Sequence, residues 1–167
     1  MTQCKNGDYL IYCDAGVEII NNIRFITDRM KEPLWFFGTH NKNKAWCKAD
    51  VFKAVFPFES DEEAREAEQV VATCFFMKVC EFTRQFVEDW LFFCELDELI
   101  DDSESNTPND DAFIEHRHDQ AILSLLAFKF GFHPHWFPAQ YGNYVKGDYF
   151  PRPDYPVLFN HHRRRND

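Results

Sequence analysis

Apolar residues along the chain fall into short continuous runs and into stretches with helical spacing. Residues 9–13 and 34–37 are continuous apolar runs, which are typical of strands covered on both faces. Apolar residues recur at helical spacing over 23–30, and Asn21 or Asn22 can cap the helix that this spacing predicts. Strands and helices therefore alternate from the start of the chain.

Two more helices are predicted from the same spacing. One covers residues 48–56 and is stopped by Pro57, whose ring cannot continue a helix. The other starts at Asp119 and ends near Lys129, with Gly131 as its stop signal.

Residues 61–94 allow two interpretations. They form one long helix, or a short helix, a strand at about 70–77 and a helix at about 81–95. The second interpretation is favoured because a short run in this segment is rich in strand formers, namely Val70, Val71, Thr73, Phe75 and Phe76.

The alternation of strands and helices predicts a single three-layer α/β domain over residues 1–167. In such domains ligands gather at the carboxyl ends of the strands, and Asp14 directly follows the first predicted strand. Residues 97–111 are dominated by Asp, Glu, Ser and Asn and predict an acidic mobile loop.

The composition excludes several function classes. The chain has 167 residues, is 45% hydrophobic and contains 19 Phe, so it can build a core. A net charge of −10 argues against general binding to nucleic acid or anionic membranes, because phosphate groups favour Lys and Arg. No apolar run is long enough to predict a membrane-spanning segment.

The cysteines indicate a reducing compartment. None of the six cysteines forms a Cys-x-x-Cys pair, and most lie within apolar segments. Residues 1–5 also lack the apolar core of a signal peptide. We therefore expect reduced cysteines and a cytoplasmic location.

Two segments before the C-terminal tail are candidates for binding or catalysis. Asp14 is a hard oxygen ligand suited to Mg²⁺ or Mn²⁺ on a diphosphate, and Gly16 allows close approach of a backbone or substrate. Alone, this pattern is more often an ordinary turn.

Residues 116–120, His-Arg-His-Asp-Gln, can contact a sugar, with Asp119 as a base for an acceptor hydroxyl. The plainer alternative is that Asp119 only caps the helix.

The end of the chain holds a third candidate. His161 and His162 can bind a metal, and Arg163 can clamp a diphosphate, although arginines here also fit a solvated tail. Loop signals around Trp136 make it a candidate for stacking on a sugar. The residues expected to bind the donor or substrate are Gly16, His116, Arg117, His118, Trp136 and Arg163.

In this order the three segments resemble those of GT-A type glycosyltransferases, the nucleotide-diphospho-sugar transferases. Residues 12–16 (Tyr-Cys-Asp-Ala-Gly) resemble the Asp-x-Asp metal segment of that fold. Residues 118–124 (His-Asp-Gln-Ala-Ile-Leu-Ser) are similar to the Asp-Gln segment that opens a late helix in the galactosyltransferase and glycogenin-type branch. Residues 160–162 (Asn-His-His) are similar to the C-terminal histidine of its metal site. The resemblance spans most of the chain.

The resemblance implies a GT-A-like three-layer α/β/α sandwich with a mixed sheet. It implies sugar transfer from a nucleotide-diphosphate donor to a hydroxyl of a glycan or small acceptor, assisted by Mn²⁺ or Mg²⁺. Asp14 and His161 or His162 would hold the metal, and Asp119 and Gln120 would face the donor sugar or acceptor.

The chain departs from the family pattern in two ways. Position 16 is Gly where the second Asp of Asp-x-Asp is expected, and Glu18 is a candidate substitute. The family also carries a nucleotide-binding βαβ half before this strand, whereas here the strand begins at residue 9. The expectation is therefore a C-terminal catalytic portion, or a remnant without that half.

Two other function classes compete with the transferase. The first is a non-catalytic module that binds a glycan or a partner through its aromatic, histidine-rich face. The second is a divalent-metal hydrolase that uses Asp14 and the histidines. The sequence leaves open the donor, the acceptor, and whether the sugar's configuration is retained or inverted.

Overall fold

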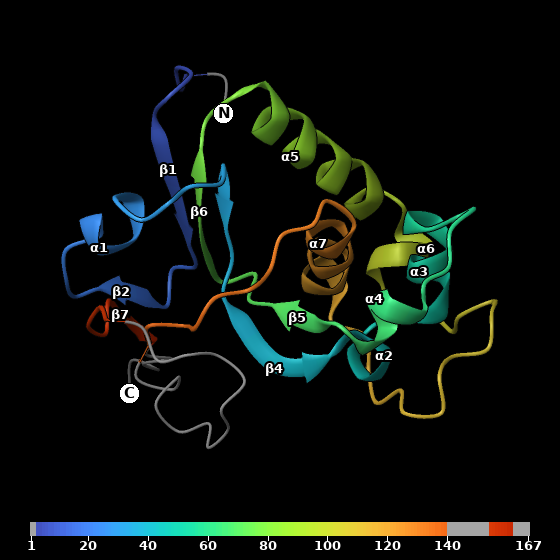
Figure 1. The fold of residues 1–167 in the computed structure, drawn as a ribbon. Coiled ribbons are helices and arrows are strands. Elements are labelled where there is room, and N and C mark those ends of the chain that lie inside the picture. The colour runs from blue at the N-terminus through green and yellow to red at the C-terminus, as the bar shows by residue number, and fades with distance from the viewer. Residues whose placement is uncertain (1–2, 140–153, 162–167) are drawn as a thin grey trace.

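The computed structural model describes residues 3–139 and 154–161. Its central sheet has the strand order β1 (Tyr9–Cys13), β6 (Cys74–Lys78), β3 (Leu34–Trp35), and both pairings are antiparallel. Figure 1 shows this sheet between a helical side and a side with short elements. The predicted α/β class is confirmed.

The mixed sheet is not found among the described residues. Their named strands pair only antiparallel, and the two parallel contacts are isolated bridges, Phe37 with His135 and Ala139 with Phe159. The chain leaves β3 for a separate ribbon before it returns as β6, so the intervening helices do not serve as crossovers between parallel neighbours. The GT-A-like sandwich itself stays a prediction.

The alternation of side chains gives the central sheet two apolar faces, as the period of two in a strand requires. Phe75 and Met77 face a core that includes α5 (Glu81–Cys94) and α7 (His118–Lys129). Cys74 and Phe76 face a second core with Phe159. In Figure 1, α5 and α7 lie on one side of the sheet, and α1 (Arg24–Thr27) lies on the other.

Two short antiparallel pairs flank the sheet. β2 (Val17–Ile19) pairs with β7 (Phe159–His161), which joins the turn after β1 to the end of the described chain. β4 (Gly38–Lys42) pairs with β5 (Glu68–Val70) next to a group of short helices. These helices are α2 (Asn43–Trp46), α3 (Ala49–Val55), α4 (Glu62–Glu66) and α6 (Asp97–Ile100).

Several predicted elements are confirmed and others are corrected. The helices expected over 48–56 and 81–95 are α3 and α5. The single strand expected over 70–77 is wrong, because the chain changes partner there: β5 pairs with β4, and β6 pairs with β1 and β3. The helix expected over 23–30 shortens to the four residues of α1.

None of the helices in the described part of the chain combines the length and the apolar character that crossing a bilayer needs.

Candidate functional site

Asp14 lies at the carboxyl end of β1, on the helical side of the sheet. Tyr12 and Asp14 are two residues apart and so share one face, and the Tyr12 hydroxyl donates to Asp14 Oδ1 at 2.8 Å. Tyr12 stacks on Phe75, with ring centroids 5.3 Å apart, which fixes this face toward α5 and α7. The hydrogen bond to Asp14 raises the pKa of Tyr12.

Asp119 approaches the same place from the first turn of α7. Partial burial raises the pKa of its carboxyl group, and the negative charge of Asp14 raises it further. The two carboxylates that the sequence placed in separate segments are therefore electrostatic neighbours. The indole N–H of Trp90 on α5 donates to the Asp119 carbonyl oxygen at 3.1 Å and ties the two helices together here.

The start of α7 differs from the prediction. The helix begins at His118, Arg117 takes the cap position, and no side chain caps the helix. Asp119 is therefore not the N-cap. His118 has a φ of 46°, in the left-handed region that a non-glycine residue seldom adopts, so the backbone is held in an unfavourable conformation directly before Asp119.

Gln120 is held by protein groups. Its Oε1 accepts from the Ala72 N–H at 3.5 Å, and its Nε2 donates to Oε1 of the buried Gln69 at 3.0 Å. Gln69 in turn donates to the Trp46 carbonyl oxygen at 3.2 Å. This chain of amides positions α7 against the link between β5 and β6, and thereby positions Asp119.

His116 lies in the interior, at 6% exposure. Its Nε2 donates to the Leu99 carbonyl oxygen at 2.8 Å, and its Nδ1 accepts from the Lys48 N–H at 3.5 Å, in the tautomer with its proton on Nε2. Burial lowers the pKa of His116 to about 4. These contacts give His116 a packing role below the candidate site.

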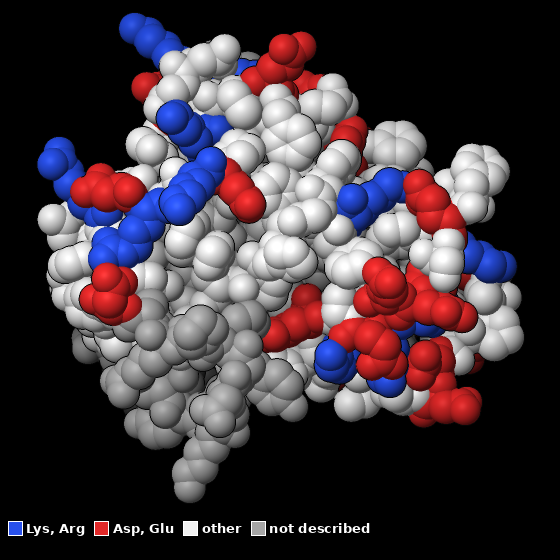
Figure 2. All heavy atoms as spheres, in the orientation of Figure 1, with Lys and Arg blue, Asp and Glu red and all other residues white. Residues whose placement is uncertain are grey.

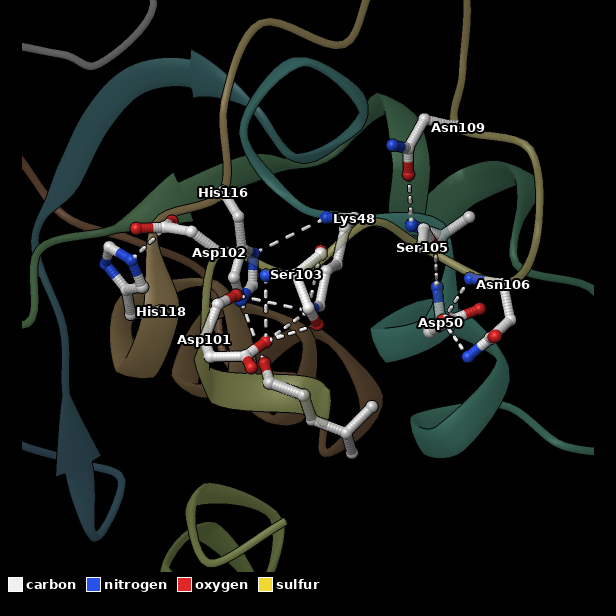
Figure 3. A network of polar contacts seen from close by, with 12 residues as sticks. Lys48, Asp50, Asp101, Asp102, Ser103, Ser105, Asn106, Asn109, His116 and His118 are labelled. Atoms are coloured by element: carbon white, nitrogen blue, oxygen red, sulfur yellow. Dashed lines mark hydrogen bonds and ion pairs between the residues drawn. The ribbon is translucent and has the colours of Figure 1, made fainter. Parts of the chain in front are cut away.

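Lys48 is also buried, with 2% of the residue exposed. Its ammonium group donates to Asp101 Oδ1 and to the Asp101 carbonyl oxygen, each at 3.1 Å, and it contacts Ser103 O and Oγ at 3.4 Å (Figure 3). Hydrogen bonds from Ser103, and then Lys48, lower the pKa of Asp101 to about 2. The network anchors the acidic segment on the body of the protein.

The acidic segment, residues 97–111, is held at further points. Its first four residues form α6. Asp50 Oδ2 accepts from the Asn106 N–H at 2.7 Å, and Asn109 Oδ1 accepts from the Ala49 N–H at 2.7 Å (Figure 3). Figure 2 shows acidic side chains gathered over α4 and this segment.

A cavity of about 450 Å³ opens beside this network. Lys48, Asp102, Asn109, Phe113 and His116 are among the residues that line it. Asp102 also contacts His118, with its Oδ1 2.9 Å from His118 Nε2, so one lining residue is linked to the residue before Asp119. The lining combines polar and charged side chains with the apolar Phe113 and Pro108.

The remaining predicted residues have different surroundings. The guanidinium of Arg117 lies 4.4 Å from the centre of the Trp46 ring and pairs with Glu115 at 2.9 Å. Trp136 packs on the second core, where its carbonyl oxygen accepts from the Tyr155 hydroxyl at 3.3 Å. Gly16 lies exposed in the turn between β1 and β2.

Of the three C-terminal candidates, His161, His162 and Arg163, only His161 is described. It pairs with Val17 in the β2–β7 ladder, and the Val17 N–H donates to the Asp14 carbonyl oxygen at 2.9 Å. The ladder therefore brings His161 to the strand that follows Asp14. His162 and Arg163 lie outside the described residues.

The predicted metal site is not complete among the described residues. Within residues 3–139 and 154–161, no three His, Cys, Asp or Glu side chains are grouped so that they could hold a metal ion. Asp14 and Asp119 supply hard oxygen donors, but these two alone do not complete a site for Mg²⁺ or Mn²⁺.

The sequence suggested no role for the side chains of Tyr12, Lys48 or Asp102. Tyr12 had a signal, since a strand places it on the same face as Asp14. Lys48 and Asp102 had none, because their partners are distant in the sequence and a lysine is expected at the surface.

Known proteins do not narrow the function further. Comparisons with models of protein families, with curated proteins and with solved structures each find no match to this chain.

The buried His116 predicts a pH dependence of stability. Its pKa is about 4 in the folded protein and near 6.5 when unfolded, so between these values the unfolded chain binds the additional proton. Above pH 6.5 the imidazole is neutral in both states and protonation of His116 takes nothing from the free energy of unfolding. As the pH decreases from 6.5 toward 4, the free energy of unfolding falls. From this residue we expect a loss of about 2 kcal/mol between pH 7 and pH 5.

Urea unfolding at the two pH values measures this loss. His116→Gln, whose amide can still donate toward Leu99, should reduce the difference between pH 7 and pH 5, although it also lowers stability at pH 7. An unchanged pH difference in His116→Gln would show that His116 is protonated without cost in the fold.

Proposed function

We propose that this chain is a GT-A-like glycosyltransferase, or the catalytic portion of one. It would move a sugar from a nucleotide-diphosphate donor to a hydroxyl of a glycan or small acceptor. The observation that carries the proposal is the approach of Asp14 and Asp119 at the carboxyl end of β1. The ordered resemblance of residues 12–16, 118–124 and 160–162 to that family agrees with it.

The two carboxylates have different surroundings and so suit different tasks. Asp14 accepts a hydrogen bond from Tyr12, which holds its carboxylate in place and supports binding of a polar substrate group. Burial and the charge of Asp14 raise the pKa of Asp119, and a base whose pKa is nearer to the working pH is the better proton acceptor. Asp119 would take the proton of an acceptor hydroxyl, a role that suits inversion at the sugar. The resemblance to a retaining branch leaves the stereochemistry open.

A divalent metal is a separate part of the proposal. When bound, such an ion would offset the charge that develops on the departing diphosphate. Asp14 is the described residue best placed to contact it, with His161 on the neighbouring ladder. Because these residues do not complete a metal site, we assign no step to the ion.

A panel of nucleotide-diphosphate sugars tests the proposal. The chain is titrated with uridine- and guanosine-diphosphate sugars, with and without Mn²⁺, and release of the nucleoside diphosphate is followed with simple sugars as acceptors. We expect saturable binding and release for at least one donor. Binding to a glycan panel without donor release would support the non-catalytic module instead. Phosphate release without a sugar donor would indicate a metal-dependent hydrolase.

A further inference from the structure

Cys13 and Cys74 face each other across the central sheet. They are directly opposed in the β1–β6 register, their Sγ atoms are 3.4 Å apart, and 61 positions separate them in the chain. Both are free thiols. They lie on the face opposite to Tyr12 and Asp14, where they contribute to the second core.

The hydrogen bonds of the ladder define the geometry of this pair. At one end the Asp14 N–H donates to the Thr73 carbonyl oxygen at 2.9 Å, and at the other the Val79 N–H donates to the Asp8 carbonyl oxygen at 2.8 Å. Hydrogen-bonded and non-hydrogen-bonded pairs alternate in an antiparallel ladder, so both ends place Cys13 and Cys74 in a non-hydrogen-bonded pair.

Such a pair brings Cα atoms to about 4.5 Å, which lies within the range of about 4.4–6.8 Å that a disulfide spans. The sulfur atoms need to approach by roughly another 1.4 Å to reach a bond of about 2.05 Å. Rotation about the two Cα–Cβ bonds can supply this movement, and the strands can keep their register.

We propose that Cys13 and Cys74 are a modification site, at which a mild disulfide oxidant closes an intramolecular cross-strand disulfide. Cys13 is the partly exposed member of the pair and Cys74 is fully buried, so the oxidant meets Cys13 first. This inference does not rest on the proposed function.

The reaction with oxidised glutathione balances as two exchanges. The Cys13 thiolate attacks one sulfur of glutathione disulfide, forms a mixed disulfide and releases one glutathione thiolate. The Cys74 thiolate then attacks Cys13 Sγ, forms the Cys13–Cys74 bond and releases the second. Two protein thiols are oxidised, one glutathione disulfide is reduced to two thiols, and the protons of the protein thiols pass to the released thiolates.

The bond would have a structural effect next to the candidate site. It would join the residue before Asp14 to the residue after Thr73 and so fix the carboxyl end of β1 to β6. Closing a loop of this length restricts the unfolded chain, which should raise the Tm. We expect a rise of at least about 5 °C for a chain of this size.

The experiment treats the full chain with oxidised glutathione and measures intact mass, linked peptides and Tm. The expected result is loss of two hydrogen atoms in mass, a peptide linking Cys13 to Cys74, the higher Tm, and reversal by dithiothreitol. Cys13→Ala should abolish the link, whereas Cys94→Ala, half-buried on α5, is the matched control that keeps it.

Three results would overturn the proposal. One is a stable glutathione adduct on Cys13 without closure, and another is a link between other cysteines. The third is an unmodified pair under conditions that oxidise Cys4. Because the wild-type chain itself is mapped, the test stays decisive even if an alanine variant folds poorly.

Discussion

Replacing Asp119 with Asn is expected to lower the turnover of a nucleotide sugar by at least about a hundred-fold, because general bases contribute roughly 10²–10⁴ in rate. Asn keeps the shape of the side chain but cannot accept the proton of an acceptor hydroxyl. Donor binding should change far less, since Asn still offers a carbonyl oxygen and removes one of two neighbouring negative charges. Initial rates and donor titrations on the same preparations measure both effects.

The matched control is Asp28→Asn, which changes an exposed carboxylate at the end of α1 and should leave turnover unchanged. Thermal unfolding of both variants checks that the fold is kept. Turnover of Asp119→Asn within a few-fold of the wild type would remove Asp119 from the chemistry. An equal loss in both variants would show that the assay reports stability.

The longest helices were predictable because their pattern is local. α5 carries apolar positions at helical spacing, and α7 carries a run of mostly apolar residues that is long enough for a helix buried on all sides. The division between β5 and β6 was not predictable, since the apolar run over 70–77 does not show which partner each half will find. The antiparallel order of the sheet depends on the same long-range choice of partners.

The candidate site, like the fold, was predictable only in part. Asp14 was found because a carboxylate that ends an apolar strand is visible in the sequence, although β1 proved to be an edge strand that is only partly buried. Asp119 was found because it stands at the start of a helix. That the two carboxylates are neighbours follows from how α7 packs against the sheet, which no local pattern encodes. Local context also failed for His116, which the sequence assigned to donor or substrate binding although its ring is buried.

Lys48→Met is expected to lower the free energy of unfolding by about 1–2 kcal/mol, an effect that the sequence would not have suggested for a lysine. The methionine fills much of the same volume, but the carbonyl oxygens of Asp101 and Ser103 lose their donor. A hydrogen bond contributes about 0.5–1.5 kcal/mol net. Because Asp101 and Ser103 are exposed residues, water replaces part of what the ammonium group supplied. Because Asp101 is partly exposed and can be hydrated, the total should stay below that of a fully buried pair.

Urea unfolding at pH 7 measures this change, with Lys53→Met as the matched control. Lys53 lies on the same helix, α3, but is exposed, so its variant should unfold within about 0.5 kcal/mol of the wild type. Limited proteolysis adds a second readout, since Lys48 anchors the segment that follows α6 and its loss should speed cleavage within 101–109. If both variants unfold alike and are cleaved alike, the Lys48 network contributes nothing to the stability of the fold. The acidic segment would then be held by its other contacts, among them those with Asp50 and Asn109.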